Sequence, residues 1–278
     1  MKSWIPAQSD KRGRSPAHMR YLRRLRLRQW SVWGCRLALL LLFFGGWQIS
    51  ADRGWIDPFL FSSPSRIGEQ LLQLLRSGDL IHHVVTTATE TVIGFSIGTV
   101  SGIALATLIW SSPFLSRVLD PYLVVINSMP KVALGPLFIV SMGAGFGSVL
   151  AMGVAITVII TALVIHSSFQ NVDPDACKLA RSFGATRRQL FVKIIFPACI
   201  PDMIAALKVN VGLAWVGVIV GEFLVSKAGL GYLIIYGFQV FNLTLVMMSL
   251  LIVAVLATVM YQLVAWLEHR LLRHRHLT

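Results

Sequence analysis

The sequence predicts an all-α polytopic membrane protein with six transmembrane helices. Of its 278 residues, 55% are hydrophobic and 13% are charged, whereas a soluble domain has about 25% charged residues. Three long segments contain no Asp, Glu, Lys or Arg: residues 91–116, 132–172 and 228–267. About 20 apolar residues cross the roughly 30 Å of hydrocarbon in a bilayer, so each segment is long enough to span one. This composition excludes a soluble enzyme, a disordered chain and a disulfide-stabilised secreted module.

The N-terminal part predicts a basic tail followed by one membrane helix. Residues 1–29 contain nine Lys and Arg residues and a single acidic residue, Asp10. The apolar segment 30–50 follows without the small-residue cleavage site of a signal peptide, which predicts an uncleaved transmembrane helix. Residues 51–84 carry charges of both signs, and we expect this segment to lie outside the cytoplasm.

The membrane core is expected to run from residue 85 to residue 268, before a short tail at 269–278. The apolar pattern predicts its helices at 85–110, 119–141, 148–167, 200–224 and 243–268. The second of them contains Pro121, Pro130 and Pro136, and we expect these prolines to break it. The Gly-rich stretch 142–148 predicts a turn before the next helix.

The net charge of +13 predicts the orientation of the chain. With both termini in the cytosol, the cytosolic segments carry 18 basic and 5 acidic residues, and the remaining charges cancel. Basic residues concentrate in cytoplasmic loops of membrane proteins. The excess is therefore interpreted as an orientation signal with some attraction to anionic lipid headgroups, and not as nucleic-acid binding.

One predicted helix carries small residues at a strict spacing of four. Gly94, Gly98, Gly102 and Ala106 lie on one stripe of the helix at 85–110. Small residues let two helix backbones approach closely inside a membrane. We expect a helix-packing seam here, although a substrate path along the same stripe is the alternative.

The segment 171–199 differs from an ordinary connection between membrane helices. Asp173 can cap a short helix that Pro174 starts, and an apolar face is expected at helical spacing from Ala176, Leu179, Ala180 and Phe183. Gly184 is expected to end this helix, and a second basic helix is predicted from about Thr186. The exposed apolar face suits docking to a cytosolic partner. An interfacial helix on lipid headgroups is the alternative.

This segment resembles the EAA loop of the permeases of ABC importers. In that loop a Glu-Ala-Ala triplet is followed by a Gly four residues after its last Ala, and by a Pro thirteen residues later. Here the triplet position reads Lys178-Leu179-Ala180, and Gly184 and Pro197 follow at those spacings. Lys178 replaces the Glu of the family.

The resemblance extends over most of the chain after residue 60, to permeases of the nitrate/sulfonate/taurine type. The motifs that carry it are Ser63-Pro-Ser-Arg-Ile-Gly68, Gly94-Phe95, Asp120-Pro121, Pro136-Leu137-Phe138, Ile200-Pro201 and Gly229-Leu-Gly-Tyr232. Each motif is short, and their order and spacing over about 200 residues make the resemblance specific.

The resemblance implies a type I ABC-importer permease in a bacterial inner membrane. Such a permease pairs as a dimer, receives its solute from an extracytoplasmic binding protein, and is driven by two copies of a separate ATPase subunit that binds ATP and Mg. A small anionic solute such as nitrate, a sulfonate or taurine is implied first, with a pyrimidine or vitamin precursor as the alternative. The residues implied to couple to the ATPase are Lys178, Leu179, Ala180, Phe183, Gly184, Ala185, Arg187 and Pro197.

Ionisable residues at membrane depth, and the residues beside them where the helix is broken, are candidates for the translocation path or a gate. The candidates are Asn127, Ser128, Pro130 and Lys131 in the Pro-broken helix, and Glu222 near the outer end of the helix at 200–224. Lys131 could attract an anion or pair with Glu90 or Glu222. Glu90 could be a snorkelling residue, Lys208 a snorkelling cation or a contact of the loop, and His166 an interfacial residue.

The sequence suggests no chemistry of its own. It has no Gly-x-x-x-x-Gly-Lys-Ser/Thr phosphate loop, no nucleophile–base pair and no cluster with metal-ligand spacing. We therefore expect no enzyme activity and no cofactor bound by this chain, and we expect its three cysteines to be free thiols. The rival hypothesis is a membrane docking subunit that transports nothing and holds a partner through its basic tail.

Overall fold

The computed structural model describes residues 16–272, and every regular element in this range is a helix. The chain divides into two units, residues 1–65 and 66–278. Among the described residues, five helices are long and apolar enough to cross a membrane, and one bent pair of helices raises the number to six. The predicted six-helix membrane fold is thus confirmed. Residues 1–15 of the tail predicted at 1–29, and residues 273–278 of the tail predicted at 269–278, lie outside the described range. The remaining residues of both predicted tails are helical.

The first unit consists mainly of α1 (Pro16–Asp52), which continues the apolar stretch expected at 30–50 on both sides. The Gln48 side chain ties the end of this helix to the residues that follow. Its amide donates to Asp52 at 3.0 Å, and its oxygen accepts the backbone N–H of Ser65 at 3.1 Å. Asp57 caps the short helix α2 (Pro58–Phe61) by accepting the N–H of Phe59 at 2.8 Å.

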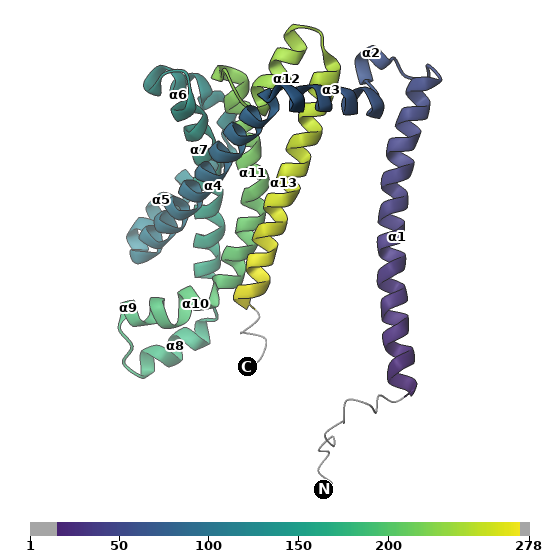
Figure 1. Ribbon diagram of the computed structural model, residues 1–278. Coiled ribbons are helices and arrows are strands. Elements are labelled where there is room, and N and C mark those ends of the chain that lie inside the picture. The colour runs from purple at the N-terminus through teal and green to yellow at the C-terminus, as the bar shows by residue number, and fades with distance from the viewer. Residues whose placement is uncertain (1–15, 273–278) are drawn as a thin grey trace. The chain divides into compact units, whose positions relative to one another are not determined.

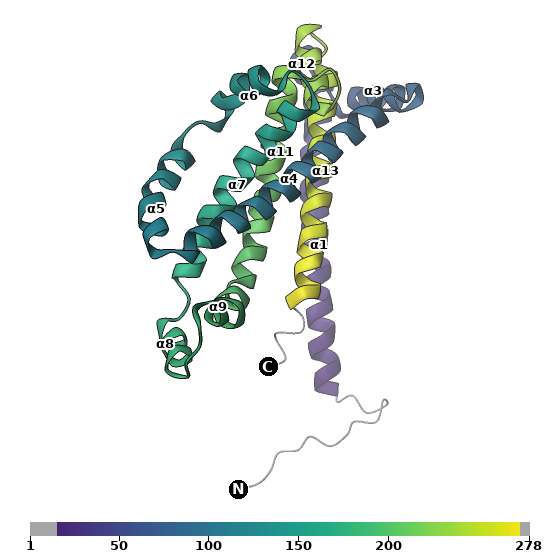
Figure 2. The same ribbon diagram turned by 90° about the vertical axis from the view of Figure 1, so that its left-hand side faces the viewer.

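The second unit is built around three long helices. After the amphipathic α3 (Pro64–Ser77), α4 (Asp79–Ser111) begins six residues earlier than predicted. It packs against α7 (Phe146–Gln170), which in turn packs along α11 (Ile200–Val225). Figures 1 and 2 show α4 crossing α7 obliquely, and α11 beside α7 in both views.

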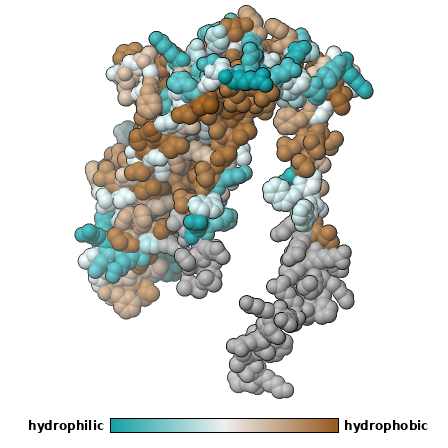
Figure 3. All heavy atoms as spheres, in the orientation of Figure 1, coloured by the Kyte–Doolittle hydropathy of each residue, from teal (hydrophilic) through white to brown (hydrophobic). Residues whose placement is uncertain are grey.

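Two C-terminal helices complete this unit. The short α12 (Leu230–Gln239) follows α11 at one end, called here the α12 end, and α13 (Leu243–Leu272) returns along α11. The opposite end, called the α8 end, carries α8 (Pro174–Ser182), α9 (Arg187–Leu190) and α10 (Phe196–Ala198). Hydrophilic side chains gather at the two ends, whereas apolar side chains cover much of the surface between them (Figure 3).

The Pro-rich membrane segment consists of α5 (Pro113–Ser128), a 3-10 turn at Lys131–Leu134 and α6 (Gly135–Met142), and α5 and α6 meet at 91°. Since α4 ends at the α8 end and α7 begins at the other, this broken pair connects the two ends. The prediction that Pro121 breaks the segment was wrong, because Pro121 lies inside α5. The break occurs at Met129 and Pro130, where Met129 leaves the helical conformation.

Candidate coupling surface and membrane sites

The segment after α7 folds as a capped helix–turn–helix. Asp173 caps α8 by accepting the N–H of Asp175 at 2.9 Å, and Pro174 occupies the first helical position. Gly184 has a φ of +78°, the left-handed conformation that glycine adopts without strain. Thr186 and Gln189 then form a reciprocal capping box that starts α9. The local sequence therefore dictates both helices and the turn between them.

The inner face of this segment is fixed to the membrane helices by aromatic packing. Phe191 lies in a π-helical turn, with its ring centroid 4.7 Å from that of Trp110 in α4 and 5.3 Å from that of Phe169 in α7. Leu190 and Cys199 are buried in the same cluster, and burial raises the pKa of the Cys199 thiol to about 11. Displacing this segment therefore displaces the ends of α4 and α7.

Arg187 adds a polar link on the same side. Its guanidinium lies over the Trp110 ring at 5.4 Å and donates to the Trp110 carbonyl at 3.4 Å. Arg187 and Ala185 line a cavity of about 480 Å³ between the segment and the end of α4. The structure thus turns Arg187 toward the membrane helices and not toward the outer surface of α8.

The outer face of α8 presents two apolar side chains. Phe183 is 82% exposed and Leu179 is 60% exposed, and we call them the docking pair. The expected apolar face is divided, because Ala180 packs inward against the buried cluster. Lys178, beside the pair, is bound by Asp175 at 2.8 Å and both side chains are exposed. Pro197, the last residue of the loop pattern, lies in α10.

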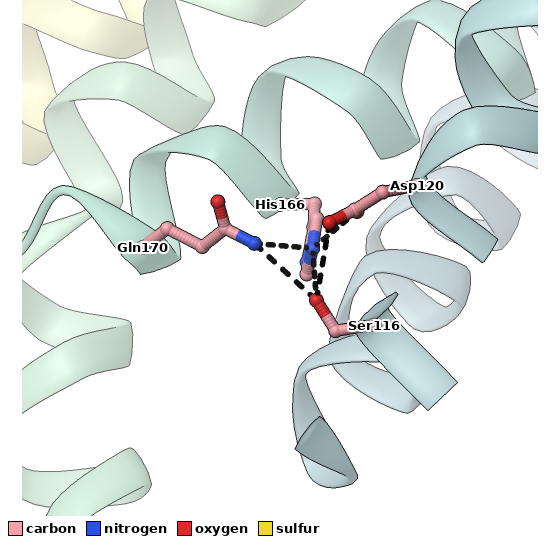
Figure 4. A network of polar contacts seen from close by, with 4 residues as sticks. All are labelled: Ser116, Asp120, His166 and Gln170. Carbon is pink, nitrogen blue, oxygen red and sulfur yellow. Dashed lines mark hydrogen bonds and ion pairs between the residues drawn. The ribbon is translucent and has the colours of Figure 1, made fainter. Parts of the chain in front are cut away.

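A polar network joins α5 to the end of α7 near this segment (Figure 4). His166 lies 3.1 Å from both the Asp120 carboxylate and the Ser116 hydroxyl, and Gln170 contacts the same imidazole nitrogen at 2.9 Å. His166 is buried in this network, with 5% of its surface exposed. The network connects the broken membrane segment to the helix that leads into α8.

Lys131 lies at the break between α5 and α6. Its ammonium donates to the Asn127 carbonyl at 2.7 Å and contacts the Asn127 side chain at 3.3 Å. It therefore satisfies a carbonyl of the last turn of α5, whose hydrogen bond the break removes. Neither Glu90 nor Glu222 pairs with Lys131 among the described residues. Asn127, Ser128 and Pro130 are exposed on this chain.

Glu222 is buried against the start of α12, with 1% of its surface exposed. Its carboxylate accepts the backbone N–H of Gly231 at 2.5 Å and that of Tyr232. The neighbouring N–H groups donate to α4, from Leu230 to the Thr87 hydroxyl at 2.7 Å and from Gly229 to His83 Nδ1 at 2.9 Å. Side chains of α4 and α11 thus satisfy the free donors that begin α12.

Glu90 lies next to Glu222 and is 2% exposed. The expectation that Glu90 snorkels to the interface was therefore wrong. Lys208 also differs from its expected roles, because it forms an ion pair with Glu268 of α13. No group of three metal-ligating side chains occurs in the described part of the chain.

The small-residue stripe of α4 faces α7. Thr157 and Thr161 lie where Cβ atoms on Gly98 and Gly102 would be, and a Cβ on Gly94 would lie 3.5 Å from Leu150. Ala106 is fully buried. A further buried polar contact, from the Asn210 amide to the Thr161 hydroxyl at 2.5 Å, joins α7 to α11.

Comparison with known proteins identifies the family. The model of the family described as "Binding-protein-dependent transport system inner membrane component" matches residues 98–273. The chain belongs to this family. It is therefore a multi-pass inner-membrane permease of a binding-protein-dependent transport system, without catalytic activity of its own.

Relatives of this permease differ in the solutes that their names record. A probable ABC transporter permease of Haemophilus influenzae is 30% identical, over 81% of this chain and 91% of the relative. The aliphatic sulfonates permease SsuC of Bacillus subtilis is 27% identical over 88% of each chain. The nitrate import permease NrtB of a Synechocystis strain is 28% identical over 66% of this chain and 67% of the relative. The relatives also include a riboflavin permease of Chloroflexus aurantiacus.

Solved structures show the same fold. A bacterial ABC transporter involved in alginate import matches with a TM-score of 0.62, over 90% of this chain and 99% of that chain, at 16% identity. A chain of the MetNI methionine ABC transporter matches with a TM-score of 0.59, over 72% of this permease and 97% of that chain. These likenesses agree with the predicted type I importer permease fold.

Several polar residues of these sites escaped the sequence analysis. Asp120 was noted only as part of a motif, and neither Thr87 nor His83 was singled out. The 146-residue separation between His83 and Gly229 leaves no periodic pattern that could reveal the contact. The one available signal was an acidic residue, Glu90, one helical turn after Thr86 and Thr87 in an otherwise apolar helix.

Proposed function

We propose that this permease forms the translocation path of an ATP-driven importer and receives the driving motion through the docking pair, Leu179 and Phe183. The observation that carries the proposal is their exposure on a helix whose other face is packed against α4 and α7. An exposed aromatic side chain on a rigid support is the usual anchor of a protein interface. A force applied to α8 then reaches the ends of both membrane helices.

The proposed partners follow from this surface and from the family. Two copies of an ATP-binding subunit, which carry ATP and Mg, contact the docking pairs of two permease copies from the cytosol. An extracytoplasmic binding protein delivers solute at the α12 end. Both termini lie in the cytosol in this arrangement, as the distribution of basic residues predicts. ATP-driven closure then moves α8 and shifts the membrane helices between two states.

The proposed solute is a small anion of the sulfonate or nitrate class. The Lys131 ammonium is a cation at a bend in the middle of a membrane segment, where polar residues mark solute paths. Asn127, Ser128 and Pro130 provide exposed polar and backbone groups beside it. Two relatives are named for sulfonate and nitrate transport. Glu222, at the start of α12, is proposed to hold an outer gate in place.

Co-purification tests the coupling proposal. The tagged permease is co-expressed with its proposed ATP-binding subunit, and the bound ATPase is quantified. Phe183→Ala removes the most exposed aromatic anchor and should weaken binding at least about tenfold, or about 1.4 kcal/mol. Phe241→Ala is the matched control, because Phe241 is 72% exposed between α12 and α13 and should leave ATPase binding unchanged.

Two results would contradict the coupling proposal. In the first, the purified permease carries no ATPase although both proteins are expressed. In the second, Phe183→Ala and Phe241→Ala retain equal amounts of it.

Uptake measurements with two substitutions at Lys131 test the solute class. Lys131→Gln removes the cation and should abolish uptake of the anion, whereas Lys131→Arg keeps the charge and should retain part of it. If Lys131→Gln transports a sulfonate or nitrate as well as the wild type does, Lys131 has no role in an anion path. Uptake of a pyrimidine or vitamin precursor in place of these anions would favour that alternative.

A further inference from the structure

Two acidic side chains from different helices meet inside the membrane bundle at the α12 end. Glu90 of α4 is 2% exposed and Glu222 of α11 is 1% exposed. Their carboxyl groups lie within hydrogen-bonding range of each other. Within the part of the chain that the structure describes, Lys178 and Lys208 form ion pairs with other carboxylates, and no ion pair involves Glu90 or Glu222. A buried pair of like charges without a cation is strongly unfavourable.

The two carboxyl groups have different surroundings. Glu222 accepts backbone N–H groups from Gly231 and Tyr232 at the start of α12. A helix N-terminus stabilises a negative charge through these donors and its dipole. Glu90 has no such donors among the described residues. The surroundings therefore favour a carboxylate at Glu222 and a neutral acid at Glu90.

One atom of each carboxyl group is left unsatisfied. Glu90 Oε2 and Glu222 Oε1 are both buried without a hydrogen-bond donor in the described structure. Buried polar atoms in native proteins almost always have a partner. A single proton between the carboxyl groups removes the repulsion and supplies the missing donor at the same time.

We propose that Glu90 and Glu222 bind one proton between them, with Glu90 as the acid that donates to the Glu222 carboxylate. The proton then connects α4 to α11, and Glu222 continues this connection to the start of α12. Three helices are held together at the α12 end by a charge-assisted hydrogen bond, which is lost when the pair loses its proton.

The other titratable groups nearby do not replace this proton. His83 of α4 accepts the Gly229 N–H through Nδ1, so a proton on that nitrogen is excluded, and its ring stacks on Tyr232 at 5.8 Å. His82 and Asp79 lie on the preceding turn of α4. The described residues of α7 include one titratable side chain, His166, which lies near the α8 end.

Infrared difference spectroscopy of the purified full-length permease tests the proposal directly. Exchange from H₂O into D₂O shifts the carbonyl stretching band of a protonated carboxylic acid, and this band should be present at neutral pH. It should be lost in Glu90→Gln. Glu69→Gln, which changes an exposed carboxyl group on α3, is the matched control and should retain the band.

Thermal unfolding provides a second readout. Glu90→Gln should keep nearly the wild-type midpoint, because its amide N–H replaces the acid as a donor to Glu222. Glu222→Gln should lower the midpoint, because its amide group faces the N–H donors of α12 without a charge. The asymmetry between two substitutions of the same kind distinguishes a shared proton from a generally sensitive site.

Three outcomes would overturn the proposal: a wild-type spectrum without the acid band, a band that persists in Glu90→Gln, or a loss of stability in Glu90→Gln as large as in Glu222→Gln. A midpoint that rises with sodium or potassium concentration in the wild type, and not in Glu90→Gln, would also overturn it, because the pair would then bind a metal cation.

Discussion

The two glycines of the segment Gly229-Leu-Gly-Tyr232 pack against the side chain of Glu222. Gly229 has a φ of +110°, and a Cβ atom there would overlap the Glu222 carboxyl group. A Cβ on Gly231 would lie 2.7 Å from Glu222 Cβ, closer than two carbon atoms can approach. Both glycines therefore leave room for the carboxylate that caps α12.

We expect Gly229→Ala and Gly231→Ala to destabilise the permease by about 1–3 kcal/mol, since each strains the backbone or displaces Glu222. Thermal unfolding in detergent measures the effect. Gly212→Ala in α11 is the control, because a Cβ there meets nothing within 4 Å, and it should be neutral or stabilising. Equal midpoints for all three variants would contradict the close packing of Glu222 on α12.

The partners of the buried polar residues could not be predicted from the sequence. Hydropathy predicts that a helix crosses the membrane, because the cost of exposing polar groups to lipid is high. Hydropathy does not predict which two polar residues contact each other. Glu90 was expected at the interface because the sequence does not reveal Glu222 beside it, and Lys208 was expected to snorkel because its partner, Glu268, lies 60 residues away.

At the scale of elements, local signals predicted the segment 171–199 well. The cap at Asp173, the glycine at 184 and the capping residues at Thr186 act within a few residues, so their effect on structure is independent of the rest of the fold. Local sequence did not predict which proline breaks the helix between residues 119 and 141. Pro121 is tolerated inside α5, whereas Pro130 follows the residue that ends it, and sequence alone does not distinguish them.

The packing of α4 on α7 predicts different losses of stability for alanine at three glycines. A Cβ on Gly94 makes an ordinary contact, whereas a Cβ on Gly98 or Gly102 overlaps the side chain of Thr157 or Thr161. Gly94→Ala should therefore be tolerated, and Gly98→Ala and Gly102→Ala should each cost about 1–3 kcal/mol. Thermal midpoints of the three variants measure this order. Three equal midpoints would show that α4 and α7 lie further apart than described.

At the scale of the whole molecule, coupling through α8 requires that the α8 end of the second unit faces the cytosol and the α12 end faces outward. Single cysteines introduced at Arg188 and Phe241 in a cysteine-free background report this orientation, because both positions are exposed. An impermeant maleimide added to intact cells should label the cysteine at 241 and leave the one at 188 unlabelled. Labelling of the cysteine at 188 alone would reverse the proposed topology.

A site formed by one continuous segment can be predicted from the sequence, whereas a site formed by distant helices cannot. The α8 segment is continuous in sequence and was found from its motif, whereas the sites at Glu222 and His166 combine residues from helices far apart in the chain. Relatives named for sulfonate, nitrate and riboflavin share the family at similar identity. The membrane fold is therefore more readily predicted than the solute.

The most direct measurement for the central claim is ATP-driven solute uptake into proteoliposomes that contain the permease, its ATP-binding subunit and the loaded binding protein. The wild type is expected to accumulate solute when ATP is supplied on the α8 side. The double substitution Leu179→Ala and Phe183→Ala should lose uptake while the permease remains folded. Undiminished ATP-driven uptake by this double variant would contradict coupling through the docking pair.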